Sequence, residues 1–132
     1  MERQKKVIDA SIAAKWFLNE EDTKNALLIR DSHINGESII IVPDTIFLEV
    51  LNALKYKNTD EESLLEVNRN LWELQLHVEK INEFFLEKAI KISLQYGLTI
   101  YDALYATIAQ LHGCPLITTD AELKKFPSAK SL

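Results

Sequence analysis

Glycine, proline and cysteine are scarce in this sequence of 132 residues, which contains three glycines, three prolines and one cysteine. So few glycines and prolines exclude a collagen-like or low-complexity chain. A single cysteine excludes an intramolecular disulfide framework and agrees with a reducing compartment. None of the glycines falls in a Gly-x-Gly or Walker pattern, so the nucleotide-binding α/β classes lose their main sequence support.

Long apolar runs are missing as well. The longest aliphatic run, Ile39 to Val42, is far shorter than the roughly 20 residues that span a bilayer as a helix. The amino-terminal residues reach Asp9 after a short apolar stretch, without the apolar core of a signal peptide. We therefore expect a soluble, cytoplasmic protein that has no membrane partner.

The composition is that of a folded chain, with 47% hydrophobic and 27% charged residues. This hydrophobic content excludes intrinsic disorder, and the length predicts one domain over residues 1–132. The net charge of −5 argues against a sequence-independent nucleic-acid binder, because phosphate contacts require clustered Lys and Arg.

Short apolar segments alternate with amphipathic ones along the chain. We expect strands at 5–10, 38–42, 77–79, 115–118 and 129–131, and helices at 11–21, 22–35, 43–56, 60–76, 82–96, 99–112 and 121–126. Ile34, Leu65 and Trp72 are expected on the apolar faces of their helices. The alternation predicts an α/β fold with a mostly parallel sheet and helices on both of its faces.

Four carboxylates fall near the predicted carboxyl ends of the strands. Asp9 and Asp120 follow the first and fourth strands, and Glu49 and Asp102 lie early in helices. Ligands of open parallel sheets bind at this edge. Carboxylates gathered there repel one another unless a cation relieves the repulsion, and oxygen-only ligands favour Mg²⁺ or Mn²⁺ over zinc. This pattern indicates metal-assisted hydrolysis.

Each carboxylate also has a structural interpretation. Asp9, Asp102 and Asp120 lie where a helix is expected to begin and could act in its cap, and Thr99 to Asp102 has the pattern of a capping box. Glu49 is expensive to bury without a partner, although an exposed stripe of its helix would solvate it. Taken singly, the residues leave both interpretations open.

Four segments in order along the chain carry a further signal: Val7-Ile8-Asp9-Ala10-Ser11, Glu49-Val50-Leu51-Asn52-Ala53-Leu54, Leu98-Thr99-Ile100-Tyr101-Asp102-Ala103-Leu104-Tyr105-Ala106 and Leu116-Ile117-Thr118-Thr119-Asp120. Together they resemble the PIN-domain ribonucleases, and within them the small VapC-type toxins of toxin–antitoxin pairs. The resemblance covers nearly the whole chain. It implies a three-layer α/β/α fold with a central, mostly parallel sheet of about five strands. It also implies an endoribonuclease that depends on Mg²⁺ or Mn²⁺.

The resemblance also assigns roles to residues of this chain. The catalytic and metal-binding acids that it implies are Asp9, Glu49, Asp102 and Asp120. It places Asp9 and Asp102 directly on the metal, Glu49 on the metal or on its water, and Asp120 at a second metal position. The polar residues that it implies beside these acids are Ser11, Thr118 and Asn52, of which the two hydroxyls would orient the carboxylates.

The implied partners are an RNA substrate, a cognate antitoxin protein and a second copy of the chain in a homodimer. An antitoxin would press a basic residue into the acidic site and fill a groove with an amphipathic helix. A PIN-domain nuclease of RNA processing without an antitoxin, and a catalytically inactive PIN-like binding module, stay open as alternatives. His33, His77 and His112 show no metal-ligand spacing, and Cys114 is expected to be a small buried residue.

Overall fold

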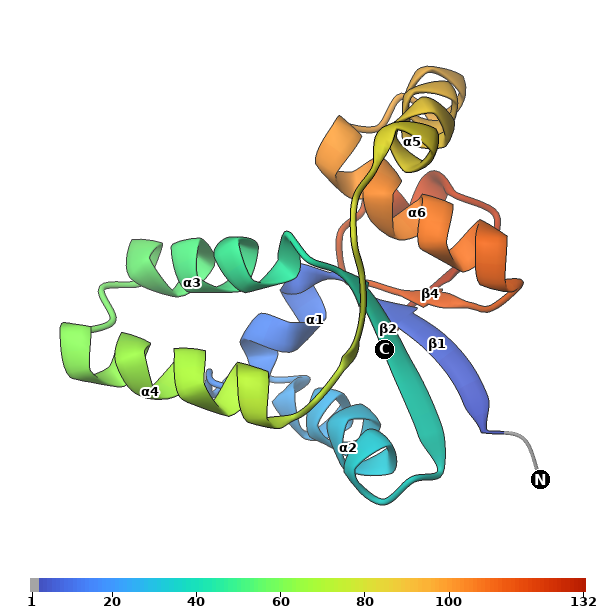
Figure 1. Cartoon of the computed structure of the whole chain (residues 1–132). Helices are drawn as coiled ribbons and strands as arrows, with labels where there is room; N and C mark the ends of the chain where they lie inside the picture. The colour runs from blue at the N-terminus through green and yellow to red at the C-terminus, as the bar shows by residue number, and fades with distance from the viewer. Residues whose placement is uncertain (1–2) are drawn as a thin grey trace.

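The computed structural model describes residues 3–132, which form a five-stranded parallel sheet between two groups of helices (Figure 1). The strands are β1 (Gln4–Ile8), β2 (Ser38–Pro43), β3 (His77–Glu79), β4 (Leu116–Ile117) and β5 (Ala129–Lys130). The helices are α1 (Ala10–Lys15), α2 (Thr23–Ile34), α3 (Ile46–Tyr56), α4 (Glu61–Glu73), α5 (Glu83–Tyr96) and α6 (Ile100–His112), with a 3₁₀ turn η1 (Leu123–Lys125).

The sheet has the order β3-β2-β1-β4-β5, and all its neighbouring strands are parallel. β1 is central, with Val7 in register with Ile41 on one side and with Leu116 on the other. These three residues are essentially inaccessible to solvent. Continuous apolar strands of this kind are expected where helices cover both faces of a sheet. The predicted α/β fold with a parallel central sheet is therefore confirmed.

The helices form the two outer layers (Figure 1). On one side, α6 packs against β1 and β2, and α5 packs on α6. Residues 103–109 of α6 are all buried, because this helix lies between the sheet and α5. On the other side, α1 and α2 contact the sheet, and α3 and α4 pack against each other next to α1. Within the described part of the chain, no helix is long and apolar enough to cross a bilayer.

The first predicted helix is shorter than expected, because α1 ends at Lys15 instead of near residue 21. The Lys15 ammonium lies 2.9 Å from Asp22 Oδ1, and the Trp16 indole N–H donates to the Ala26 carbonyl at 2.9 Å. Both contacts turn the chain toward α2. The helix predicted from residue 43 begins only at Ile46, because Pro43 completes β2 beside Glu79 of β3. The last predicted helix is only the 3₁₀ turn η1.

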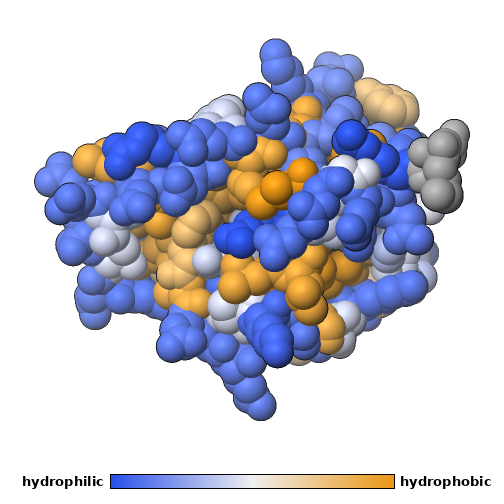
Figure 2. Space-filling view, turned by 90° about the horizontal axis from the view of Figure 1, so that it is seen from below, coloured by the Kyte–Doolittle hydropathy of each residue, from blue (hydrophilic) through white to orange (hydrophobic). Residues whose placement is uncertain are grey.

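The apolar faces predicted for α2 and α4 are only partly buried. Ile34, Leu65 and Trp72 are 57%, 52% and 58% exposed, so their predicted inward placement is wrong. Trp72 instead stacks on Phe47 of α3 with ring centroids 4.0 Å apart. Figure 2 shows apolar side chains gathered in the middle of the face seen from below. Within residues 3–132, the helices leave these apolar side chains at the surface.

A candidate acidic site at the carboxyl edge of the sheet

Asp9 lies directly after β1 and is only 4% exposed. Its Oδ1 accepts hydrogen bonds from the Ser11 hydroxyl at 2.6 Å and from the Ile12 N–H at 3.2 Å. Its Oδ2 accepts one from the Thr118 hydroxyl at 2.5 Å. Asp9 therefore caps α1, as the structural interpretation expects, and also belongs to a hydrogen-bond network that reaches the end of β4.

A second set of hydroxyl contacts links the ends of β1 and β4. Thr118 is fully buried, and its Oγ1 accepts from the Asp120 N–H at 2.9 Å while donating to Asp9. The Ser11 Oγ accepts from the Thr119 hydroxyl at 3.1 Å. The sequence analysis included Thr119 only as a member of the segment from Leu116 to Asp120 and gave it no role of its own. A signal was available in the sequence, because Thr119 lies beside an acid at a strand end, as Ser11 lies near Asp9.

Glu49 and Asp102 reach this edge from helices on opposite faces of the sheet. The Tyr105 hydroxyl of α6 donates to Glu49 Oε1 of α3 at 3.2 Å. The Thr99 hydroxyl accepts from the Asp102 N–H at 3.0 Å, so the hydroxyl and not the Asp102 carboxylate caps α6. Sequence analysis gave Tyr105 no role, because an aromatic residue on a buried helix face is ordinarily core.

The acids affect one another electrostatically. Burial raises the pKa of Asp9 above its ordinary value, and the charge of Asp120 adds to the shift. Burial also raises the pKa of Asp102, with further increases from Asp120 and Asp9. The pKa of Glu49 is raised to about 6, mainly by burial and additionally by the charges of Asp102 and Asp9. Four acids from four separate segments thus share one electrostatic environment, which we call the acidic site.

The raised pKa of Glu49 predicts a pH-dependent stability difference in metal-free protein. Below pH 4.5 both the folded and unfolded states hold the proton, and above pH 6 the folded state must carry a poorly solvated charge. We expect Glu49→Gln to match the wild type at pH 4 and to exceed it by about 1 kcal/mol at pH 8, a figure reduced for partial exposure. Urea unfolding in EDTA at several pH values measures the difference. An equal difference in stability between Glu49→Gln and the wild type at pH 4 and at pH 8 would contradict a raised pKa of Glu49.

A groove of about 460 Å³ opens beside the acidic site. Its lining includes Ser11, Glu49, Asn52, Lys57 and Thr119. Asn52 is exposed one turn after Glu49 on α3, so the structure places it at the groove and not on the Asp9 network. An extended, polar chain could therefore lie across α1 and α3 with access to Glu49.

The donor set of the acidic site fits a hard divalent cation, because it consists of carboxylate and hydroxyl oxygens, and burial with neighbouring negative charges raises the pKa of Asp9, Glu49 and Asp102. The side chains of these acids are, however, spread apart. Among residues 3–132, no three His, Cys, Asp or Glu side chains converge closely enough to enclose a metal ion as they stand. The acids would therefore approach a bound ion by side-chain rotation or through water.

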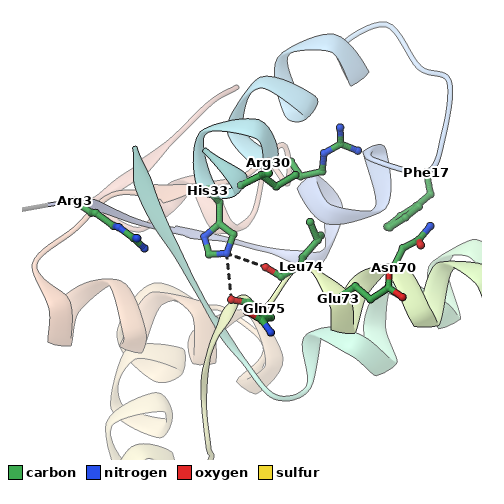
Figure 3. A pocket seen from close by; sticks show the side chains of 9 residues that line it. Arg3, Phe17, Arg30, His33, Asn70, Glu73, Leu74 and Gln75 are labelled. Atoms are coloured by element: carbon green, nitrogen blue, oxygen red, sulfur yellow. Dashed lines mark hydrogen bonds between the residues drawn. The ribbon is translucent and has the colours of Figure 1, made fainter. Parts of the chain in front are cut away.

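The histidines lie elsewhere and are engaged in structural contacts. His112 Nε2 lies 2.7 Å and His77 Nε2 3.6 Å from the same Glu79 oxygen, a proximity that the sequence analysis did not find. His33 lines a separate pocket of about 570 Å³ (Figure 3). Its Nδ1 accepts from the Ile40 N–H at 3.1 Å, so Nε2 carries the proton and donates to carbonyls after α4. None of the four acids lines that pocket.

Comparison with known proteins identifies relatives of this chain. Residues 6–128 match the PIN domain family. Ribonuclease VapC3 of Pyrobaculum aerophilum is 30% identical over 131 residues, which cover 94% of this chain and 96% of that protein.

Solved structures share the fold. The toxin VapC20 of Mycobacterium tuberculosis, described as cleaving the sarcin–ricin loop, superposes with a TM-score of 0.73 at 12% identity, covering 90% of this chain and 92% of that one. A chain of a toxin–antitoxin complex from Klebsiella pneumoniae superposes with a TM-score of 0.68 at 19% identity, covering 94% of both chains. At these identities the likeness establishes the three-layer arrangement of helices and sheet.

Proposed function

The chain belongs to the PIN-domain family, as a relative of VapC ribonucleases, and from this membership we propose that it is an endoribonuclease dependent on Mg²⁺ or Mn²⁺. The observation that carries the proposal is the acidic site itself. Acids from four separate segments meet at the carboxyl edge of the sheet, where burial and the charges of neighbouring acids raise the pKa of Asp9, Glu49 and Asp102. Such an arrangement is costly for stability and useful for binding a cation.

In this proposal the metal-binding residues are Asp9, Glu49, Asp102 and Asp120. A divalent ion bound there would activate water and stabilise the leaving oxygen of a phosphodiester. Asp9 is held in one orientation by bonds to both of its carboxylate oxygens. Asp102 projects from the first turn of α6 with its carboxylate left out of the helix cap. The hydroxyls of Ser11 and Thr118 orient Asp9, as partners of ligating carboxylates commonly do.

The groove beside the acids would guide the RNA substrate. Lys57 lies in its lining and can supply a positive charge for a phosphate, whereas Lys15 is paired with Asp22 and Glu20. One cation at the rim and an overall charge of −5 give little sequence-independent affinity. We therefore propose that the enzyme selects a structured RNA target and does not degrade RNA processively.

We also propose that the protein is the toxin of a VapBC-type pair. Its relative carries the name of a VapC ribonuclease, and a structural neighbour was solved as a toxin–antitoxin complex. A mainly apolar groove of about 700 Å³ between α3 and α4, which includes Leu48, Leu51 and Leu65, adjoins the acidic groove at Asn52. It suits an amphipathic antitoxin helix. The uncovered apolar side chains elsewhere suit a homodimer contact.

The decisive test is cleavage of a mixed pool of structured RNAs by the purified protein with Mn²⁺ or Mg²⁺. We expect discrete cuts that disappear in EDTA and return when the metal is restored, because the acids alone cannot activate water for this reaction. Mapping the new ends identifies the target. Cleavage that persists in EDTA would refute the metal mechanism. Absence of cleavage, together with absence of Mn²⁺ binding in calorimetry, would favour an inactive binding module.

A further inference from the structure

Tyr105 of α6 donates a side-chain hydrogen bond to an acid of the site, although it lies outside the hydroxyl network around Asp9. Its side chain is completely inaccessible to solvent, and its hydroxyl donates to Glu49 Oε1 at 3.2 Å. A buried tyrosine hydroxyl needs a polar partner, and this carboxylate supplies it. The contact therefore has a structural explanation, and the question is whether it also serves the site.

The location of Tyr105 favours a role in the site. It lies three residues after Asp102 on α6, so the same face of one helix carries an acid and the hydroxyl that holds another acid. Glu49 comes from α3, on the opposite side of the sheet from α6. The hydrogen bond thus fixes the distance between carboxylates whose helices belong to different layers.

Glu49 needs such a constraint more than Asp9 does. Asp9 has three hydrogen bonds and is almost fully buried, whereas Glu49 is half-buried on a longer side chain with an additional rotatable bond. The Tyr105 bond engages Oε1, which leaves Oε2 available to a cation or to its water. Loss of this bond would let the Glu49 carboxylate turn out into the groove.

From this geometry we propose that Tyr105 is a positioning residue that holds the Glu49 carboxylate toward Asp102 and Asp9 so that they can share one divalent cation. The inference rests on the proposed metal-dependent nuclease and extends it to a residue outside the acids. Tyr105 does not touch the cation or the RNA. It acts through Glu49 alone.

The test is a double-mutant cycle with Tyr105→Phe and Glu49→Gln, in which the Mn²⁺ dissociation constant is measured by calorimetry without RNA. We expect Tyr105→Phe to weaken Mn²⁺ binding about tenfold, as loss of a partner of a ligating carboxylate does. In the Glu49→Gln background the same change should have no further effect, because no carboxylate remains to be positioned. Tyr101→Phe, on the same helix but 63% exposed, is the matched control and should bind Mn²⁺ like the wild type.

Kinetics on an RNA cleaved by the wild type give a second result. Tyr105→Phe should lower kcat about tenfold and leave KM for RNA within twofold, with unchanged circular dichroism. Wild-type Mn²⁺ affinity in Tyr105→Phe, or an equal loss in the Glu49→Gln background, would overturn the positioning role. A wild-type protein that binds Mn²⁺ and shows the cycle, but cuts no RNA, would refute the nuclease and leave the positioning role standing. A wild type that binds no Mn²⁺ would overturn both.

Discussion

Replacing Asp102 by Asn will reduce metal-dependent RNA cleavage by at least about 100-fold, because a bound ion supplies several kcal/mol of transition-state stabilisation in such reactions. Asn keeps the size of the side chain and removes the charge that would hold the cation. The fold should persist, since the Thr99 hydroxyl and not the Asp102 carboxylate makes the cap of α6. Single-turnover cleavage at saturating Mn²⁺ measures the loss.

The same variant should be more stable than the wild type when no metal is present. Burial and the nearby charges of Asp120 and Asp9 raise the pKa of Asp102, so its ionised form is unfavourable in the folded protein at neutral pH. Thermal unfolding in EDTA at pH 8 should show a higher Tm for Asp102→Asn. Adding Mn²⁺ should reverse the order, since the wild type gains more from a ligand that binds only its folded state. Full activity in Asp102→Asn would remove this residue from the site.

The sequence predicted the sheet well because its strands are buried on both faces. Such strands are continuous apolar runs, and Ile39 to Val42 is unambiguous in this respect. The glycines at positions 97 and 113 mark the ends of α5 and α6 correctly, because both adopt the left-handed conformation that terminates these helices. Local chemistry thus determines these elements without information from the rest of the chain.

The elements that sequence analysis placed wrongly depend on contacts between distant residues. The end of α1 is set by the Lys15–Asp22 salt bridge and by the hydrogen bond from the Trp16 indole to the Ala26 carbonyl. Hydrophobic periodicity does not predict either contact. The exposure of Trp72 shows a second limit of prediction from hydrophobic periodicity. Its spacing is that of a core residue, but its side chain stays 58% exposed although it stacks on Phe47. Periodicity identifies an apolar face and does not identify what covers it.

In the candidate site, too, some features could be predicted from local sequence and others depend on contacts between distant residues. Strand ends and a resemblance in four segments were enough to propose that the acids lie together, because parallel topology brings the carboxyl ends of strands to one edge. Tyr105 could not be selected in this way, since its contact with Glu49 joins segments far apart in the chain. Positioning groups act through geometry that a sequence pattern does not contain.

Thr118 provides the other large expected effect, this time on folding as well as on activity. Its buried hydroxyl donates to Asp9 Oδ2 and accepts from the Asp120 N–H. Thr118→Val preserves the shape of the side chain but leaves both of these groups without their partner. The loss of a hydrogen bond to a charged group and the burial of a polar group without a partner both destabilise the fold. We therefore expect the free energy of unfolding to fall by about 2–4 kcal/mol. Urea unfolding at pH 8 in EDTA measures the change.

Thr118→Ser separates the hydroxyl from the methyl group. Serine retains both hydrogen bonds and loses one buried methyl group, so its cost should be about 1 kcal/mol. If packing alone held β4 in place, Thr118→Val would be the milder change, which is the opposite of our expectation. Cleavage should follow the same order, with Thr118→Val about 10–100-fold slower, because Asp9 loses a partner that orients it. The residue at the end of β4 that stabilises the fold would then also orient the Asp9 carboxylate.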